Sequence, residues 1–239
     1  MRVTELAALL DVSDMTIRRD LDVLDEAGLL VKVHGGAKVS TEHSADEPGF
    51  DANSALQTAE QEAIARAAAD LVEGGATIGL MAGTTTWRLA GALAVIPNLT
   101  VVTNSMRVAE VFDEFKRPDR NIILTGGVRT PSDALVGPIA ATALSALHVD
   151  TLFIGVHGMS EQAGLTTPNI LESDTNRAFI RSAGRKIVLA DHSKWGVTGL
   201  SSFASLDDID MLITDRLLSD AAIDTLRAHI PDVRKVGSA

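Results

Sequence analysis

Cysteine is absent from this chain of 239 residues. Its absence excludes a disulfide scaffold, catalysis by a thiolate and a zinc site with cysteine ligands, and it gives no reason to place the protein outside the cell. The rest of the composition, with 46% hydrophobic and 22% charged residues, is typical of a soluble globular protein. The length is sufficient for one or two domains with a substantial core.

Long apolar segments are missing as well. Near the N-terminus, Glu5 and Asp11 interrupt the sequence before the apolar part of a signal peptide can form. The longest uncharged stretch, Leu89–Met106, contains proline and asparagine and fits a helix, a loop and a strand better than a membrane span. We therefore expect a cytoplasmic protein without a membrane partner.

Positive charge is scarce. The formal net charge is −11, and even residues 1–39 contain more acidic than basic side chains. Because contacts to phosphate dominate the affinity of proteins for nucleic acids, composition alone argues against a nucleic-acid partner. A DNA-binding surface in this chain has to gather its basic side chains on one face.

Three segments differ in their sequence pattern. Residues 1–39 have helical periodicity and then a short extended stretch, which we interpret as one domain. Residues 40–55 are polar and rich in turn formers, which is typical of a linker. Residues 56–239 alternate short β-branched runs with helical stretches. The runs are Ala76–Leu80, Leu99–Thr103, Asn121–Thr125, Thr151–Gly155, Lys186–Ala190, Met211–Thr214 and Asp232–Val236.

The alternation predicts that residues 56–239 form an α/β domain. Strands followed by helices form a mostly parallel sheet, and continuous apolar runs indicate strands buried on both faces. In such a sheet the loops at the carboxyl ends of the strands form the ligand crevice. The helical patterns include Leu56–Val72, Thr85–Leu93, Ser105–Phe115, Gly137–Leu147 and Leu171–Ala183.

The first segment predicts a helix-turn-helix followed by a wing. Thr4 is a suitable cap for a short helix, and Ser13 is a good N-cap for a second helix after a short turn. Helices in this arrangement are typical of proteins that place the second helix in the major groove of DNA. The apolar stripe of the first helix consists of Leu6, Leu9 and Leu10.

The second helix of this segment separates apolar from polar side chains. At steps of about 100° per residue, its two sides differ in composition. The apolar side carries Ile17, Leu21 and Leu24, and the opposite side carries Met15, Arg18, Arg19 and Asp22. Arginine binds guanine or phosphate through two hydrogen bonds, although an ordinary solvated helix surface has the same composition.

Polar and glycine-rich loops follow several of the β-branched runs. Gly83-Thr84-Thr85-Thr86 opens a helix, where amides and hydroxyls form a cradle for an anion, although a threonine-rich helix cap has the same sequence. These loops together predict a pocket for a phosphorylated sugar, with Lys194 as a positive charge for phosphate. The others are Thr103–Ser105, Gly126–Gly127, Gly155–Gly158 and Asp191–Lys194.

Catalysis is not indicated by the acidic and histidine residues. Asp150, His157, Glu172, Asp191 and His192 offer acid–base chemistry, but no spacing among them singles out a catalytic pair or a metal site. His157 is explained equally well as a structural loop residue. We expect no catalytic residues, no cofactor and no metal.

The string VSDMTIRRDLDVLDEAGLLVKVHGGA resembles the helix-turn-helix signature of the DeoR family of transcription regulators. The family normally has a further helix before this segment, so the resemblance implies a truncated winged helix-turn-helix with an incomplete core. It also implies DNA contacts in the second helix and the wing. Together with Met15, which shares the polar side of the helix, the expected DNA-binding residues are Ser13, Thr16, Arg18, Arg19, Lys32 and His34.

The strings GTTTWRLAGAL, TNSMRVAE, LTGGVRT and LADHSKWG are similar to the DeoR sensor domain. The resemblance implies a fold like that of ribose-5-phosphate isomerase without catalytic activity. At His157 many relatives have aspartate, so the substitution removes a carboxylate that the isomerases use. The effector pocket is expected to contain Gly83, Thr84, Thr85, Thr86, Asn104, Ser105, Gly126, Gly127, His157, Asp191 and Lys194.

These features predict a DNA-binding repressor of sugar or polyol catabolism genes. Its expected partners are a double-stranded operator, a phosphorylated sugar or polyol effector and further copies of itself. One alternative is a sugar-phosphate isomerase-like enzyme with a vestigial N-terminal segment. Another is a sensor whose truncated N-terminal domain does not bind DNA.

Overall fold

A computed structural model of the protein describes residues 3–10, 12–26, 30–33, 36–39 and 49–237. The chain divides into two compact units, Met1–His43 and Ser44–Ala239. Within the described ranges no helix has both the length and the apolar character needed to cross a membrane.

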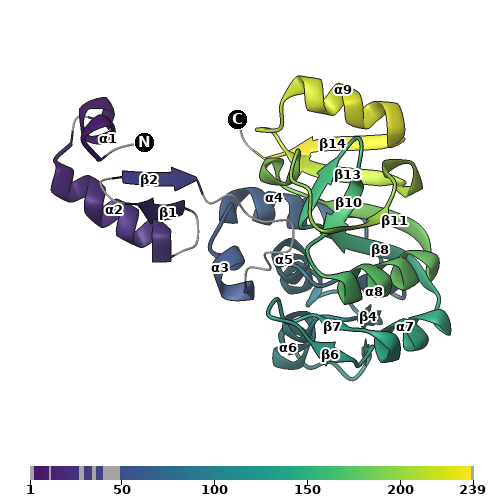
Figure 1. Ribbon diagram of the computed structural model, residues 1–239. Coiled ribbons are helices and arrows are strands. Elements are labelled where there is room, and N and C mark those ends of the chain that lie inside the picture. Colours follow the sequence, from purple (N-terminus) through teal and green to yellow (C-terminus); the bar gives the residue numbers. More distant parts are fainter. Residues whose placement is uncertain (1–2, 11, 27–29, 34–35, 40–48, 238–239) are drawn as a thin grey trace. The chain divides into compact units, whose positions relative to one another are not determined.

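The first unit is a helix-turn-helix with a two-stranded wing (Figure 1). Ser13 caps the second helix, because its hydroxyl oxygen accepts a hydrogen bond from the Thr16 amide at 3.1 Å. The predicted order of helix, turn, helix and wing is confirmed. Its elements are α1 (Val3–Leu10), α2 (Asp14–Glu26) and the antiparallel pair β1 (Leu30–Val33) and β2 (Gly36–Val39).

The core of the first unit differs from the predicted stripe on α1. The buried side chains are Val3 and Ala7 of α1 and Ile17 and Leu21 of α2. Leu6 packs against this core only in part, and Leu9 is 71% exposed. Leu9 is two residues from Ala7, which places it about 200° around the helix axis and away from α2. Leu10, the last residue of α1, is also exposed, so the predicted stripe of Leu6, Leu9 and Leu10 is wrong.

The second unit is built on a parallel sheet, and each of its strands overlaps one of the predicted runs (Figure 1). Every described pairing between neighbours in this sheet is parallel. The spatial order is β14 (Asp232–Val236), β13 (Met211–Asp215), β11 (Ala183–Leu189), β8 (Val149–Gly155), β3 (Thr77–Leu80), β4 (Thr100–Thr103) and β5 (Asn121–Leu124).

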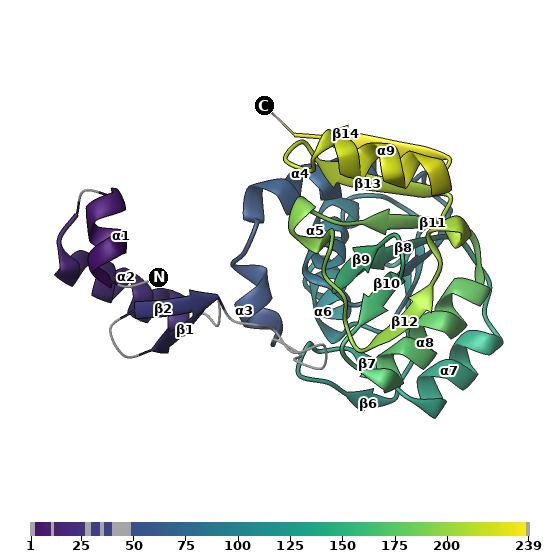
Figure 2. The same cartoon turned by 45° about the horizontal axis from the view of Figure 1, so that its top comes forward.

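Helices cover both faces of this sheet (Figure 2). Alternating side chains of one strand enter different cores, since Phe153 of β8 joins the core on one face, whereas Leu152 and Ile154 join the core on the other. The Phe153 face is covered by α4 (Thr58–Ala69), α5 (Thr84–Leu93) and α6 (Met106–Glu114). The other face is covered by α7 (Pro138–Ser145), α8 (Ile170–Arg181) and α9 (Asp220–His229).

Two small sheets were not predicted from the sequence. Their strands are short and rich in glycine and polar residues, so they lack the apolar runs that indicate strands. One is the hairpin of β6 (Val128–Arg129) and β7 (Leu135–Val136). The other has the order β12 (Ser201–Ala204), β10 (Gly164–Thr167) and β9 (Gly158–Ser160). Single turns of 3-10 helix are η1 (His192–Lys194) and η2 (Leu206–Asp208).

Two expectations need correction in this unit. The predicted linker 40–55 ends in a short helix, α3 (Phe50–Ser54), whose Phe50 side chain is buried. One aromatic side chain among polar residues gave no periodic signal, which is why the pattern suggested a linker. Strand β5 is largely exposed, because it lies at the edge of the sheet, whereas its apolar sequence predicted burial on both faces.

Two glycines of the second unit should respond oppositely to alanine. A Cβ at Gly79 of β3 would lie 2.7 Å from atoms of Leu152 and Phe179, whereas a Cβ at Gly91 of α5 meets nothing within 4 Å. Gly79→Ala should lower stability by about 1–3 kcal/mol through overpacking. Gly91→Ala should raise it by about 0.5–1 kcal/mol, because glycine is a poor helix former. Urea unfolding measures both; two changes of the same sign would contradict the described core.

Candidate functional site

The exposed side of α2 is the candidate DNA-binding surface. Arg18 and Arg19 are exposed, Met15 is 79% exposed, and Thr16 lies one turn before Arg19 and Asp20. Ile17 and Leu21 are buried on the opposite side, so the sequence-based division of this helix is confirmed for these residues. Within the wing, Lys32 belongs to β1. His34 lies outside the described residues.

The order in which the chain adds strands to the sheet of the second unit reverses between the neighbouring strands β3 and β8. From β3 the chain proceeds to β4 and β5 on one side, and from β8 to β11, β13 and β14 on the other. Loops that leave neighbouring strands toward opposite sides open a crevice at this topological switch point. Gly155 ends β8, and a Cβ there would lie 3.1 Å from the Ala82 carbonyl oxygen, so glycine lets the two loops approach closely.

A cavity lies at this switch point. Its residues come from the loops after β3, β8 and β11, from α8 and from segments outside the sheet. They are Phe50, Ala82, Gly83, Thr84, Thr85, Ser132, Gly155, Val156, His157, Thr167, Pro168, Glu172, Asn176, Leu189, Lys194 and Phe203.

Five of the residues expected in the effector pocket line this cavity, namely Gly83, Thr84, Thr85, His157 and Lys194. Gly83 is the N-cap of α5, and no side chain caps the first amides of this helix. Amides at the start of a helix attract anions through their N–H groups and the helix dipole. Among the described residues that line the cavity, Lys194 is the only lysine or arginine.

Other expected pocket residues lie behind the cavity wall and hold its loops. The Thr86 hydroxyl donates to the carbonyl oxygen of Met81 at 2.7 Å. The Asn104 side chain accepts from the Ala82 amide at 3.0 Å. Asp191 is buried, caps η1 and accepts from the Gln61 amide group at 3.4 Å, which fixes the loop that carries Lys194.

Three further expected residues have structural positions away from the cavity. Ser105 is the N-cap of α6, where its hydroxyl oxygen accepts from the Val108 amide at 3.2 Å. Gly127 has φ of +123°, and a Cβ there would lie 2.5 Å from the Val136 carbonyl oxygen. Gly127 therefore permits the close approach to β7, and neither Gly126 nor Gly127 is among the described residues that line the cavity.

Sequence reasoning missed several residues that line the cavity. Thr167 and Asn176 are buried polar residues of β10 and α8, and the Thr167 hydroxyl donates to the carboxylate of Glu172. Glu172 and Asn176 are four residues apart on one helix and thus share a face, which is the signal that could have found them. Phe50 and Ser132 had no such signal.

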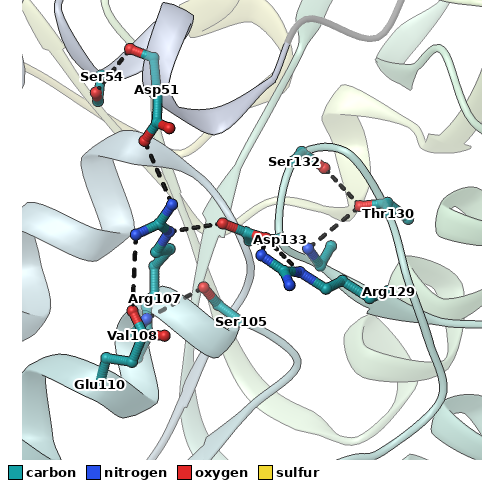
Figure 3. A network of polar contacts seen from close by, with 11 residues as sticks. Asp51, Ser54, Ser105, Arg107, Val108, Glu110, Arg129, Thr130, Ser132 and Asp133 are labelled. Carbon is teal, nitrogen blue, oxygen red and sulfur yellow. Dashed lines mark hydrogen bonds and ion pairs between the residues drawn. The ribbon is translucent and has the colours of Figure 1, made fainter.

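A buried carboxylate supports the loop that carries Ser132 (Figure 3). The side chain of Asp133 is 6% exposed and accepts hydrogen bonds at 2.6 Å from both Arg107 and Arg129. Burial by itself raises the pKa of Asp133, but the hydrogen bonds and charges of Arg129 and Arg107 outweigh it, so the pKa lies below its usual value. The ionised form of Asp133 therefore holds the two arginines together.

Among the residues that the structure describes, no group of three or more His, Asp or Glu side chains is arranged to hold a metal ion. The pair of His192 Nδ1 and Asp215 at 3.1 Å lies outside the cavity lining.

Comparison with known families identifies both units. Residues 1–43 match the DeoR-like helix-turn-helix domain, and residues 56–216 match the DeoR C-terminal sensor domain. The chain belongs to the DeoR family of transcription regulators. This confirms the family that the sequence resembles.

Relatives of this DeoR-family chain have names that describe gene regulation. The HTH-type transcriptional regulator GolR of Listeria innocua is 38% identical over 221 residues, which cover 92% of this chain and 85% of GolR. The HTH-type transcriptional repressor GlcR of Bacillus subtilis is 36% identical over 222 residues, covering 93% and 84%. These names agree with the membership of this chain in the DeoR family of transcription regulators.

Solved structures overlap with the DeoR-family chain only in part. Ribose 5-phosphate isomerase from Methanocaldococcus jannaschii aligns with a TM-score of 0.40 and 17% identity, covering 56% of this chain and 53% of the isomerase.

Asp133→Asn should lower stability by about 1.5–3 kcal/mol at neutral pH, because it removes the charged partner of two arginine hydrogen bonds. A carboxyl group with a folded pKa below its unfolded value stabilises the fold above the unfolded pKa, near 3.8 for Asp133. This contribution is lost as the pH falls through the folded pKa. The difference in unfolding free energy between wild type and variant should therefore shrink below about pH 4.

Urea unfolding at about pH 7, 5 and 3 measures this difference. Asp113→Asn is the matched control, since Asp113 is an exposed partner of Lys116 and its loss should cost less than about 0.5 kcal/mol. A difference for Asp133→Asn that stays undiminished at about pH 3 would show that the ionised carboxylate is not what stabilises the loop.

Proposed function

We propose that this DeoR-family regulator represses sugar or polyol catabolism genes. A phosphorylated sugar bound in the switch-point cavity controls its affinity for DNA. The observation that carries this proposal is the cavity itself, whose lining includes both the start of α5 and Lys194. The names of relatives such as GlcR, a repressor, support the sign of regulation.

The phosphate group of the effector fits the α5 side of the cavity. The amides of Thr84 and Thr85 stand at the positive end of the helix dipole, and Lys194 adds a full positive charge. Together these groups supply the donors and the charge that a phosphate dianion requires.

The sugar part of the effector fits the polar wall formed by β10 and α8. Thr167, Glu172 and Asn176 present hydroxyl, carboxylate and amide groups there, which recognise sugar hydroxyls through hydrogen bonds. His157 lies at the end of β8 on the same cavity. Gly126 and Gly127 are not among the described residues that line the cavity, so the proposed effector contacts do not include them.

The DNA contact is assigned to the exposed side of α2. Arg18 and Arg19 reach base edges or phosphates, Ser13, Met15 and Thr16 lie at the N-terminal end that enters the groove, and the wing follows with β1. A protein with a net charge of −11 binds DNA in this way by a small local patch. We propose binding by at least two copies, because helix-turn-helix proteins read paired half-sites.

Arg18→Ala and Arg19→Ala should each weaken DNA binding about 10- to 100-fold, since one bidentate contact is worth about 1–3 kcal/mol. Gel retardation with a duplex selected from a random-sequence pool by the wild-type protein measures the change. Lys116→Ala on the second unit removes one exposed positive charge and serves as the control. Equal retention by all three variants would exclude α2 as the reading helix.

Lys194→Ala should weaken binding of a sugar phosphate about 10-fold or more, because it removes a charged partner of the phosphate. Thermal shift with pentose, hexose and triose phosphates and with inorganic phosphate identifies the ligand, and titration calorimetry measures its affinity. Lys116→Ala is again the control. If none of these compounds stabilises the wild-type protein, the effector part of the proposal is wrong.

A further inference from the structure

The switch-point cavity is completed by a residue from outside the sensor-domain match. Phe50 lines the cavity, whereas the sensor match begins at residue 56. Phe50 is the first residue of α3, which among the described residues is the first helix after the wing strand β2. The segment that leads from the DNA-binding unit to the sensor thus contributes directly to the proposed effector site.

The Phe50 side chain is held on several sides. It is 7% exposed, and its ring meets that of Trp87 edge-on, with 5.5 Å between ring centroids. The guanidinium carbon of Arg107 lies 5.0 Å from the centroid of the Phe50 ring, within the range of a cation–π contact. The Phe50 amide donates to the carbonyl oxygen of Pro131 at 3.4 Å.

The rest of α3 is anchored by two arginines from the helices beside the cavity. Arg107 of α6 binds the Asp51 carboxylate at 3.3 Å (Figure 3). Arg88 of α5 donates to the Ser54 carbonyl oxygen at 2.8 Å, and 14% of its side chain is exposed. The Arg88 anchor is worth more than the Asp51 pair, because the Asp51 side chain is 90% exposed and its charge is well solvated.

The same two arginines are also connected to the cavity lining, Arg88 through its own helix and Arg107 through Asp133. Arg88 lies on α5, whose first turn contains the cavity residues Thr84 and Thr85. Arg107 also binds Asp133, next to the cavity residue Ser132 (Figure 3). A molecule that fills the cavity touches Phe50 and, at the same time, the start of α5 and the loop to which α3 is fastened.

We propose that α3 is the coupling element of this regulator: a sugar phosphate in the cavity fixes Phe50 and α3 against α5 and α6, and this alters the segment that leads to the DNA-binding unit. The inference rests on the proposed function. A ligand shifts an equilibrium only through contacts that differ between two states, and Phe50 is a cavity contact carried by the connecting segment itself.

Two variants test the coupling without repeating the test of the site. Arg88→Ala removes the hydrogen bond to the Ser54 carbonyl oxygen and changes none of the residues that line the cavity. Phe50→Leu keeps an apolar side chain at the cavity wall but removes the ring contacts with Trp87 and Arg107. It is the second test of the coupling and replaces Arg88→Ala if that variant does not fold. Arg117→Ala, an arginine paired only with Asp119 among the described contacts and outside the cavity, is the matched control.

The measured quantity is the ratio of DNA dissociation constants with and without the sugar phosphate that gives the largest thermal shift in the wild type. For the wild type and Arg117→Ala we expect a ratio of about 5–150, the usual range of allosteric coupling. For Arg88→Ala the ratio should fall below about 2, while the affinity for the sugar phosphate stays within about threefold of wild type. For Phe50→Leu both the ratio and the affinity should fall.

Hydrogen exchange provides a second readout of α3. Amides of Phe50–Ser54 should exchange more slowly when the sugar phosphate binds the wild type, and this slowing should be lost in Arg88→Ala. If both variants keep the wild-type ratio while their stability falls, α3 only packs on the sensor and the inference is wrong, whereas the proposed function stands. If no sugar phosphate binds the wild type, the proposed function fails and the inference falls with it.

Discussion

The position of the site depends on one feature of the topology: the chain adds strands outward in opposite directions from the neighbouring strands β3 and β8. Crossovers between parallel strands are right-handed, so a chain that reverses its direction across the sheet must place its helices on the other face. The crossover helices α5 and α6 accordingly cover one face and α8 and α9 the other. The loops after β3 and β8 part at this point, and the cavity lies between them.

The loops around the cavity are held by buried polar side chains, of which Asn104 and Asp191 bind backbone amides and Asp133 binds two arginine side chains. Asn104 holds the loop after β3, Asp191 holds the loop before Lys194, and Asp133 holds the loop of Ser132. Each of these side chains is almost fully buried, and leaving such a group without a partner costs about 1–3 kcal/mol. This cost favours a single arrangement of the loops, so the cavity is shaped before any ligand arrives.

The proposed function requires two separate charge arrangements in an acidic chain. The DNA-binding unit exposes adjacent arginines on α2 while its own small core of Val3, Ala7, Ile17 and Leu21 is shielded. The sensor unit keeps a lysine and uncapped amides at one end of its sheet. Local placement of positive charge therefore matters more than the net charge of the whole chain.

Periodicity and loop chemistry are local properties, so the amino-acid pattern was enough to predict the helix-turn-helix and the strands of the parallel sheet. For the same reason it pointed to Gly83, Thr84, Thr85, His157 and Lys194, which line the cavity. Folding sets which loops face one another: it places Gly127 against β7 and brings Phe50 and Ser132 to the cavity. The strand order and the packing of the short helix α3 arise from contacts between residues that are far apart in the sequence, and a local sequence pattern does not predict such contacts.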